Sequence, residues 1–175
     1  MQNGERRYIL ETSHFDGLHD IMKNVNVKLA EARDWDAAIG VAWVTFQQVS
    51  AQVSDEAGAR DFRDGLTSTQ LYIDFLQGKY PLFCAYQGKR VVGMLTLQDM
   101  AHISLFFVKK EFQGRGIGKE LLKACRAYCR EHGVSDLTVN AAPTGMPFYL
   151  ANGFVASAGE RFEGGLRFTP MTLRA

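Results

Sequence analysis

Closely spaced glycines and basic side chains make Gln113–Lys119 the stretch of this chain with the clearest potential for binding a ligand. The apolar run His102–Val108 before it predicts a strand, and Ile117, Leu121 and Tyr128 within and after it recur at the spacing of a helix. A first helical turn carries N–H groups without partners and a partial positive charge, and glycine lets a ligand approach that backbone closely. The junction is therefore typical of a diphosphate site, although a glycine turn that binds nothing has the same local pattern.

Two familiar phosphate-binding loops do not match this turn. A Walker A loop would need glycine at position 113 and Ser or Thr after Gly118-Lys119, where the chain has Gln113 and Glu120. A dinucleotide-binding fingerprint that began at Gly114 would need its third glycine where the chain has Lys119. The sequence therefore predicts neither a P-loop nucleotide triphosphatase nor a Rossmann-type dinucleotide site.

The spacing of the turn resembles the acyl-CoA-binding motif of the GNAT superfamily of N-acetyltransferases. Val108 is followed after four residues by Gln113, which leads into Gly116 and Gly118 in the order Gln-x-x-Gly-x-Gly. A second block agrees with the first: Leu137–Ala141 predicts a strand, and a Tyr-x-x-x-Gly-Phe run from Tyr149 is similar to the helix end that follows this strand in the superfamily. The specific resemblance covers residues 83–154, and a weaker match in element order runs from Val25 to the C-terminus.

The resemblance implies that the chain binds acetyl-CoA as a co-substrate, with the backbone of the glycine turn holding the diphosphate. The main chain around Phe107 and Val108 would pair with the pantetheine amides as an added strand would. Many relatives have an asparagine seven residues before the tyrosine, where this chain has Ala142, so Asn140 or Thr144 is left to supply an equivalent contact. The residues assigned to the coenzyme site are Phe107, Val108, Gln113, Gly114, Arg115, Gly116, Ile117, Gly118, Lys119 and Asn140.

Two side chains are the candidates for proton transfer. Tyr149 corresponds to the general acid that is usual in the superfamily, because a phenol with a pKa near 10 can donate a proton to the departing thiolate. An amine with a pKa near 10.4 must lose a proton before it attacks, and His102, at the start of its strand, is the first candidate for the base. Asp99 is the second candidate for the base. Either residue also has a purely structural interpretation: Asp99 is typical of a turn, and His102 of a histidine that packs at the end of a strand.

Residues 25–175 are expected to form one α/β domain, with a mixed central β-sheet and helices on both faces, as in the GNAT fold. Residues 1–24 are an N-terminal extension without a counterpart in the family pattern. The expected strands are Val25–Leu29, Leu82–Tyr86, Val91–Leu97, His102–Val108, Leu137–Ala141, about 154–162 and about 166–173. The expected helices run from Asp34 or Asp36 to about Ser50, from Ser54 to a break near Gly65, from Thr67 to Leu76, from Gly116 to about Arg130, and around Tyr149.

Composition agrees with a globular protein of the cytoplasm. The chain has 175 residues, 46% of them hydrophobic and 22% charged, with a formal net charge of +1 and no basic run that would suggest nucleic acid. No secretory signal or apolar stretch long enough to span a bilayer is predicted. Three cysteines do not make a disulfide framework, and Cys125 and Cys129 lack further ligands at zinc-site spacing, so no metal is expected.

The sequence as a whole predicts an acetyl-CoA-dependent N-acetyltransferase that moves an acetyl group to a primary amine by direct attack in a ternary complex. A small amine, a peptide N-terminus and a lysine side chain all remain open as acceptors. The alternatives are a non-catalytic acyl-CoA-binding or sensing module and an interaction domain with an empty site. Exposed edge strands leave a homodimer open as well.

Overall fold

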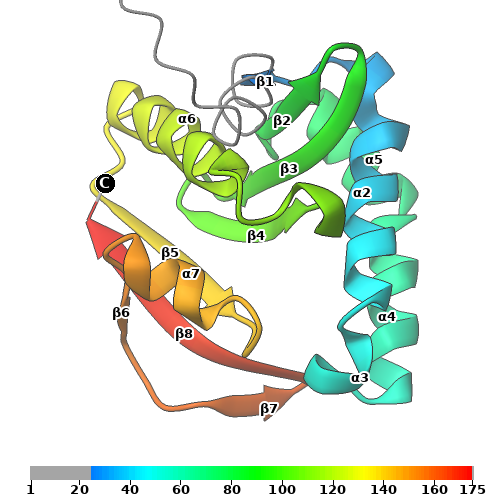
Figure 1. Cartoon of the computed structure of the whole chain (residues 1–175), viewed down its shortest axis with the longest axis vertical. Coiled ribbons are helices and arrows are strands. Elements are labelled where there is room, and N and C mark those ends of the chain that lie inside the picture. Colours follow the sequence, from blue (N-terminus) through cyan, green and yellow to red (C-terminus); the bar gives the residue numbers. More distant parts are fainter. Residues whose placement is uncertain (1–24, 175) are drawn as a thin grey trace, which may run out of the picture.

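The computed structural model describes residues 25–174, so the predicted N-terminal extension lies outside the described residues. Within them the chain forms an eight-stranded mixed sheet in the order β1-β2-β3-β4-β5-β8-β6, with β7 paired to β8 (Figure 1). The strands are β1 (Val25–Leu29), β2 (Leu82–Gln87), β3 (Arg90–Gln98), β4 (His102–Val108), β5 (Asp136–Ala141), β6 (Val155–Ala156), β7 (Arg161–Glu163) and β8 (Leu166–Arg174). The helices are η1 (Ala32–Asp34), α2 (Trp35–Gln47), α3 (Ser50–Val53), α4 (Glu56–Leu66), α5 (Thr69–Leu76), η2 (Lys110–Phe112), α6 (Ile117–Glu131) and α7 (Met146–Ala151).

The first four strands form an antiparallel meander joined by short connections. Between β3 and β4 the chain reverses at Asp99 and Met100, both of which have positive φ angles, of 49° and 64°. Asp99 is thus part of the tight turn, in accordance with one of the two interpretations of its role. This meander confirms the predicted order of the three central strands.

β4 and β5 run parallel but remain paired over a very short distance. Their register contains only His102 opposite Thr138 and Ile103 opposite Val139, after which the two strands diverge. The register of β3 against β4 shifts at the same place, because Ser104 is an extra residue between the pairs Thr96–Leu105 and Leu97–Ile103. The two strands therefore separate beyond Ile103 and Val139, and a bulge in β4 lies where the separation starts.

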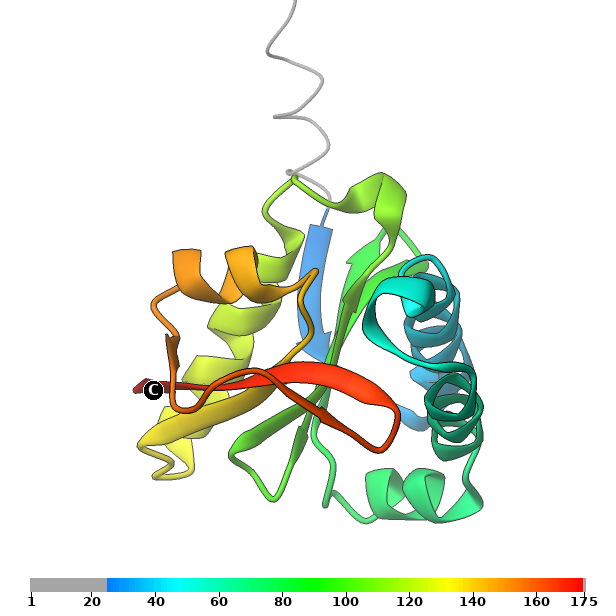
Figure 2. The same cartoon turned by 90° about the horizontal axis from the view of Figure 1, so that it is seen from below.

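Helices cover both faces of the sheet, as predicted. Figure 2 shows α6 and α7 (yellow-green and orange) on one side of the sheet and the helices of residues 35–76 (cyan to green) on the other. Leu121, Leu137 and Phe154 belong to the buried cluster on the first face, and Val41 and Met94 belong to the cluster on the second face. The alternation of β5 explains the first cluster, because Leu137, Val139 and Ala141 are buried and the residues between them are exposed.

Several predicted boundaries were wrong for local reasons. The helix expected from Ser54 begins at Glu56, because the Asp55 carboxylate accepts the Gly58 N–H and caps it. The next helix follows Ser68 rather than Thr67. The helix predicted to end near Ser50 ends at Gln47, and a separate short helix, α3, follows it.

The single strand expected over residues 154–162 is also divided. β6 and β7 are separate strands that pair with different parts of β8. The segment between them begins Ser157-Ala158-Gly159, which offers no large apolar side chain to bury against the sheet. β7 and β8 consequently form a hairpin that extends beyond the sheet toward α3 (Figure 1).

Candidate active site

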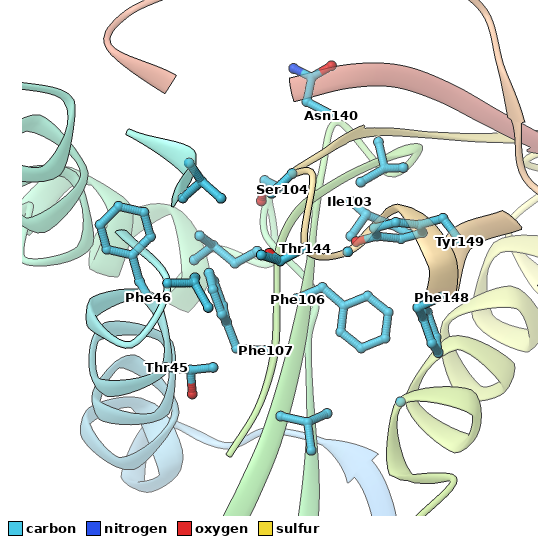
Figure 3. Close-up of a pocket in the computed structure, with 18 of the residues that line it drawn as sticks. Thr45, Phe46, Ile103, Ser104, Phe106, Phe107, Asn140, Thr144, Phe148 and Tyr149 are labelled. Carbon is cyan, nitrogen blue, oxygen red and sulfur yellow. The ribbon is translucent and has the colours of Figure 1, made fainter. Parts of the chain in front are cut away.

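A cavity of about 1070 Å³ lies where β4 and β5 separate, and both faces of the sheet contribute to its lining. Successive residues of β4 point to opposite sides: Phe106 packs with the α6 cluster and Phe107 with the α2 cluster. Figure 3 shows the two rings on either side of the strand, with Phe148 beyond Phe106 and Phe46 beyond Phe107. The cavity therefore has two halves, one beside α6 and α7 and the other beside α2 and α4.

The glycine turn lies in the half beside α6. Gly116 is the N-cap of α6 and has a φ angle of 80°, which is a left-handed conformation that a side chain disfavours. Gly118 has a different reason to be glycine, because a Cβ added there would lie 3.1 Å from Cε2 of the Phe148 ring. Both glycines line the cavity, so this turn presents backbone rather than side chains to a ligand.

Polar and basic side chains around the turn have distinct positions. Gln113 Nε2 donates a hydrogen bond of 2.8 Å to the carbonyl oxygen of Val108, so this side chain closes the turn after β4. Lys119 is exposed and lines the cavity. The Arg115 guanidinium instead lies over the Phe112 ring, 5.4 Å from its centroid, and Arg115 is not among the lining residues. Lys119 is thus the cation best placed to meet an anionic ligand at this end.

Tyr149 lies on α7 and contributes its hydroxyl to the cavity. Its side chain is 8% exposed and packs edge-on against Phe106, Phe148 and Phe154. Figure 3 shows the hydroxyl oxygen pointing away from α7 into the cavity, toward Thr144. Burial raises the pKa of Tyr149 above its ordinary value of 10, so the phenol holds its proton at neutral pH.

His102 lies at the closed end of the gap, where β4 and β5 are still paired. Its Nδ1 is 2.8 Å from Thr138 Oγ1 on the neighbouring strand, and the residue lines the cavity. Burial lowers the pKa of His102 below 6.5, and the nearby Asp99 carboxylate opposes this with a smaller effect. The imidazole is therefore neutral at pH 7 and able to accept a proton. Asp99 itself is not among the lining residues.

The structure does not bring Asn140 to the glycine turn. Asn140 lines the cavity from the face of β5 opposite to Val139 and Ala141, and those two residues pack with the α6 cluster. Figure 3 shows its amide pointing away from Tyr149. Thr144, the other candidate, lies on the loop before α7 and points into the cavity.

Sequence reasoning named few of the individual residues in the cavity half beside α2. Phe46 and Phe62 line it, and their rings stack with centroids 4.1 Å apart. Ser104, at the bulge of β4, also lines the cavity and has a buried hydroxyl without a hydrogen-bond partner in the described part of the chain. No local pattern identifies these residues, because each contributes through its position in the fold and none belongs to a motif.

The described residues contain no group of three or more His, Cys, Asp or Glu side chains that would hold a metal ion. Cys125 and Cys129 are both fully buried in the core beneath α6, which accounts for their spacing by packing. None of the helices among residues 25–174 combines the length and the apolar character needed to cross a membrane.

Fold and cavity together define an α/β domain with a coenzyme-sized cavity between two separating parallel strands and a glycine turn at a helix start. The family model described as acetyltransferase (GNAT) domain matches residues 50–175 of this chain. The chain belongs to this family, and is thereby an N-acetyltransferase of the GNAT type. No curated protein sequence matches it.

Solved structures agree in fold at low sequence identity. A GCN5-related N-acetyltransferase from Rhodopseudomonas palustris is 21% identical, with a TM-score of 0.74 over 86% of this chain and 95% of that one. The PaiA N-acetyltransferase from Thermoplasma acidophilum, solved in complex with coenzyme A, is 17% identical, with a TM-score of 0.72 over 86% of this chain and 99% of its own. YncA from Salmonella typhimurium, a putative acetyltransferase solved with acetyl-CoA, is 19% identical, with a TM-score of 0.60 over 86% and 94% of the two chains.

Proposed function

We propose that this protein transfers the acetyl group of acetyl-CoA to a primary amine by direct attack in a ternary complex. The observation that carries the proposal is the Tyr149 hydroxyl, which points from α7 into the cavity that opens between β4 and β5. When bound, acetyl-CoA supplies a thioester carbonyl and a thiolate leaving group. The amine nitrogen forms a bond to the carbonyl carbon, the carbon–sulfur bond breaks, and the products are an amide and a thiol.

The residues present fit a coenzyme with a diphosphate and an amide-bearing arm. The backbone of β4 beyond Ile103 has no ladder partner on β5, so those of its N–H and C=O groups that point away from β3 are available to an extended ligand. The cavity continues from there to Gly116, Gly118 and Lys119 at the start of α6. The N-terminal end of this helix and the lysine both favour negative charge.

Tyr149 would act as the general acid. A raised pKa keeps the phenol protonated at neutral pH, and burial among Phe106, Phe148 and Phe154 holds the ring in place. A protonated hydroxyl can donate a hydrogen bond to sulfur as negative charge develops, and can then transfer its proton.

His102 would act as the base that takes a proton from the incoming ammonium group. Its lowered pKa keeps the ring neutral at pH 7, and the contact between Nδ1 and Thr138 leaves Nε2 as the remaining ring nitrogen. The described lining residues include no Asp or Glu, so the cavity offers no carboxylate for this role. The proposal also includes a cytoplasmic location, with which the three thiols Cys84, Cys125 and Cys129 are compatible.

Calorimetric titration with acetyl-CoA tests the coenzyme site without knowledge of the acceptor. Saturable binding to the wild-type protein is expected, and Lys119→Glu should weaken the affinity by at least about tenfold because a charged contact is replaced by repulsion. Glu is well tolerated in a first helical turn, so the substitution should leave the fold intact.

Lys123→Glu is the matched control. Lys123 is exposed on the same helix and lies outside the cavity lining, with Nζ 3.8 Å from the Glu120 carboxylate. The change in charge is identical, and an exposed pair of this kind contributes little to stability. Equal loss of affinity in both variants, or no binding to the folded wild-type protein, would overturn the proposed site and favour an interaction domain. Saturable binding without turnover for any amine would favour a non-catalytic sensing module.

A further inference from the structure

We propose that the acceptor is a small molecule with a single amine on an uncharged apolar group, such as an arylalkylamine, rather than a diamine, a polyamine or a peptide. This inference rests on the proposed function and identifies the class of the second substrate. The inference is based on the residues that line the half of the cavity beside α2 and α4. The apolar wall of this half is formed by Phe46, Val49, Val53, Phe62, Leu66 and Phe107.

Aromatic packing gives the apolar wall a defined shape. The rings of Phe46 and Phe62 stack 4.1 Å apart at an interplanar angle of 23°, and Phe62 meets Phe107 edge-on at 6.0 Å and 65°. The Phe46 side chain is buried, whereas the Phe62 side chain is half-buried. A ring or branched chain that enters here removes apolar surface from water on both partners and finds aromatic neighbours at contact geometry.

The charges of the cavity disfavour an acceptor with a second ammonium group. The titratable lining residues in the described part of the chain include His102, Lys119 and Arg167, and no Asp or Glu is among them. A second ammonium would lose its hydration in this half without gaining an anionic partner, which is costly. The basic residues near the cavity add repulsion to that cost.

Arg167 does not convert the site into one for amino acids. Its guanidinium already contacts the Glu160 carboxylate at 2.8 Å, so a substrate carboxylate would compete with an existing ion pair. Lys119 lies at the glycine turn, in the other half of the cavity. The acceptor is therefore expected to be uncharged apart from its amine.

The hairpin formed by β7 and β8 contributes to the lining of this half and favours a small acceptor over a peptide. Ser54 forms a β-bridge with Leu166, and the Asp55 N–H donates to the Gly165 carbonyl at 3.0 Å. Gly58 and Gly165 touch so closely that a Cβ on either would overlap the other's backbone. The contact joins the hairpin to the start of α4 and holds Leu166 and Phe168 in the cavity lining, where they reduce the room for a longer chain.

Rates of acetyl-CoA-dependent thiol release with two amines test the inference directly. We expect kcat/KM for 2-phenylethylamine to exceed that for 1,4-diaminobutane by at least about tenfold, since differences in apolar contact of this size give such ratios. A higher kcat/KM for the diamine or for spermidine would overturn the inference, as would transfer to a peptide N-terminus in preference to 2-phenylethylamine.

A carboxylate placed in the apolar wall should reverse the preference. Val49 is half-buried and lines the cavity, so Val49→Asp would give a second ammonium its missing partner. We expect the ratio of the two kcat/KM values to shift at least about tenfold toward 1,4-diaminobutane. Val44→Asp is the control, because Val44 is 50% exposed on α2 and outside the lining, and it should leave the ratio unchanged.

Acetyl-CoA binding separates failure of this inference from failure of the proposed function. Calorimetry of the wild-type protein and of both valine variants reports whether the coenzyme half is intact in each. A protein that binds acetyl-CoA but transfers its acetyl group to no apolar amine contradicts the acceptor class alone. A folded protein that does not bind acetyl-CoA contradicts the transferase and the acceptor class together.

Discussion

The coenzyme half of the cavity and the acceptor half are built in different ways. The half beside α6 and α7 comes from two stretches of chain, within residues 103–119 and 139–152, and it presents mainly backbone at the glycine turn. The half beside α2 and α4 is assembled from residues 45–66 and 166–168 together with Phe107 of β4, and it presents apolar side chains. The first half is therefore determined by local chain geometry, whereas the second depends on packing between distant segments.

Tyr149 lies with the coenzyme half, and Tyr149→Phe should have the largest effect on catalysis. The substitution removes one hydroxyl and retains the buried ring, so kcat should fall by about a hundredfold, as expected for loss of a general acid. The affinity for acetyl-CoA, measured by calorimetry, should stay the same. A variant with wild-type kcat would remove Tyr149 from the mechanism and weaken the contrast between the two halves.

Phe62→Ala tests whether the acceptor half acts independently of the coenzyme half. Loss of the stacked ring should raise KM for 2-phenylethylamine by about tenfold while the acetyl-CoA affinity remains unchanged. Phe162→Ala is the control, because Phe162 is 54% exposed and outside the cavity lining. A parallel loss of acetyl-CoA affinity in Phe62→Ala would show that the two halves are coupled.

Gly116→Ala tests the dependence of the coenzyme half on backbone conformation. A φ angle of 80° is unfavourable for alanine, so the variant should be destabilised by about 1–2 kcal/mol in thermal unfolding. Gly40→Ala should instead stabilise the protein, with a free energy of unfolding higher by about 0.5–1 kcal/mol. Gly40 lies inside α2 and no atom lies within 4 Å of an added Cβ. Equal effects at the two glycines would contradict the account of the turn.

The titration of His102 should produce the smallest effect in the wild-type enzyme, because this titration is confined to acidic pH. Because burial lowers its pKa below 6.5, kcat/KM should be insensitive to this group at pH 7 and should fall only on acidification below pH 6.5. As pH falls, His102 binds a proton at a higher pH in the unfolded chain than in the folded protein, because burial lowers its pKa only in the folded state. The contribution of neutral His102 to stability is therefore present above pH 6.5 and is lost as pH falls through the pKa of the folded state.

His102→Gln supplies the control for that pH dependence. If His102 is the base, the acidic limb of its pH–rate profile disappears in the variant, together with part of the loss of thermal stability at low pH. A glutamine variant that retains the acidic limb would assign the limb to a different group. Thermal unfolding at pH 7 should change little, since the side chain makes one hydrogen-bonding contact, with Thr138.

Local pattern was sufficient to predict the sheet and the glycine turn at which we propose that the coenzyme binds. The alternation of β5, the helical spacing of α6 and the glycine turn between β4 and α6 each depend on residues close in sequence, and the structure contains all three elements. Element ends were less predictable, because Ser54 and Thr67 are residue types as suitable for an N-cap as their neighbours Asp55 and Ser68, which hold the N-cap positions in the structure.

The acceptor half illustrates what local pattern cannot show. Phe46 and Phe62 have the spacing of ordinary core residues, and only the fold reveals that their stacked rings line a cavity. Asn140 was considered together with Thr144 because Ala142 stands where many relatives have an asparagine. Only the structure shows that strand alternation turns the Asn140 side chain to the face opposite Val139 and Ala141. Ser104 was not identified at all, because a bulge depends on how two strands pair.

The contact between Gly58 and Gly165 also bears on how the protein matures on the ribosome. A nascent chain that has been made as far as Phe154 contains every residue of the two motifs, and α4 with its Phe62 ring has emerged much earlier. Gly58, at the start of α4, nevertheless cannot contact Gly165 until that residue has been synthesised. Formation of this contact closes a loop of the chain between residues 58 and 165, and closing so long a loop has an entropic cost and is slow. The surface that we propose selects the acceptor is thus completed only after the residues proposed to bind the coenzyme have been made.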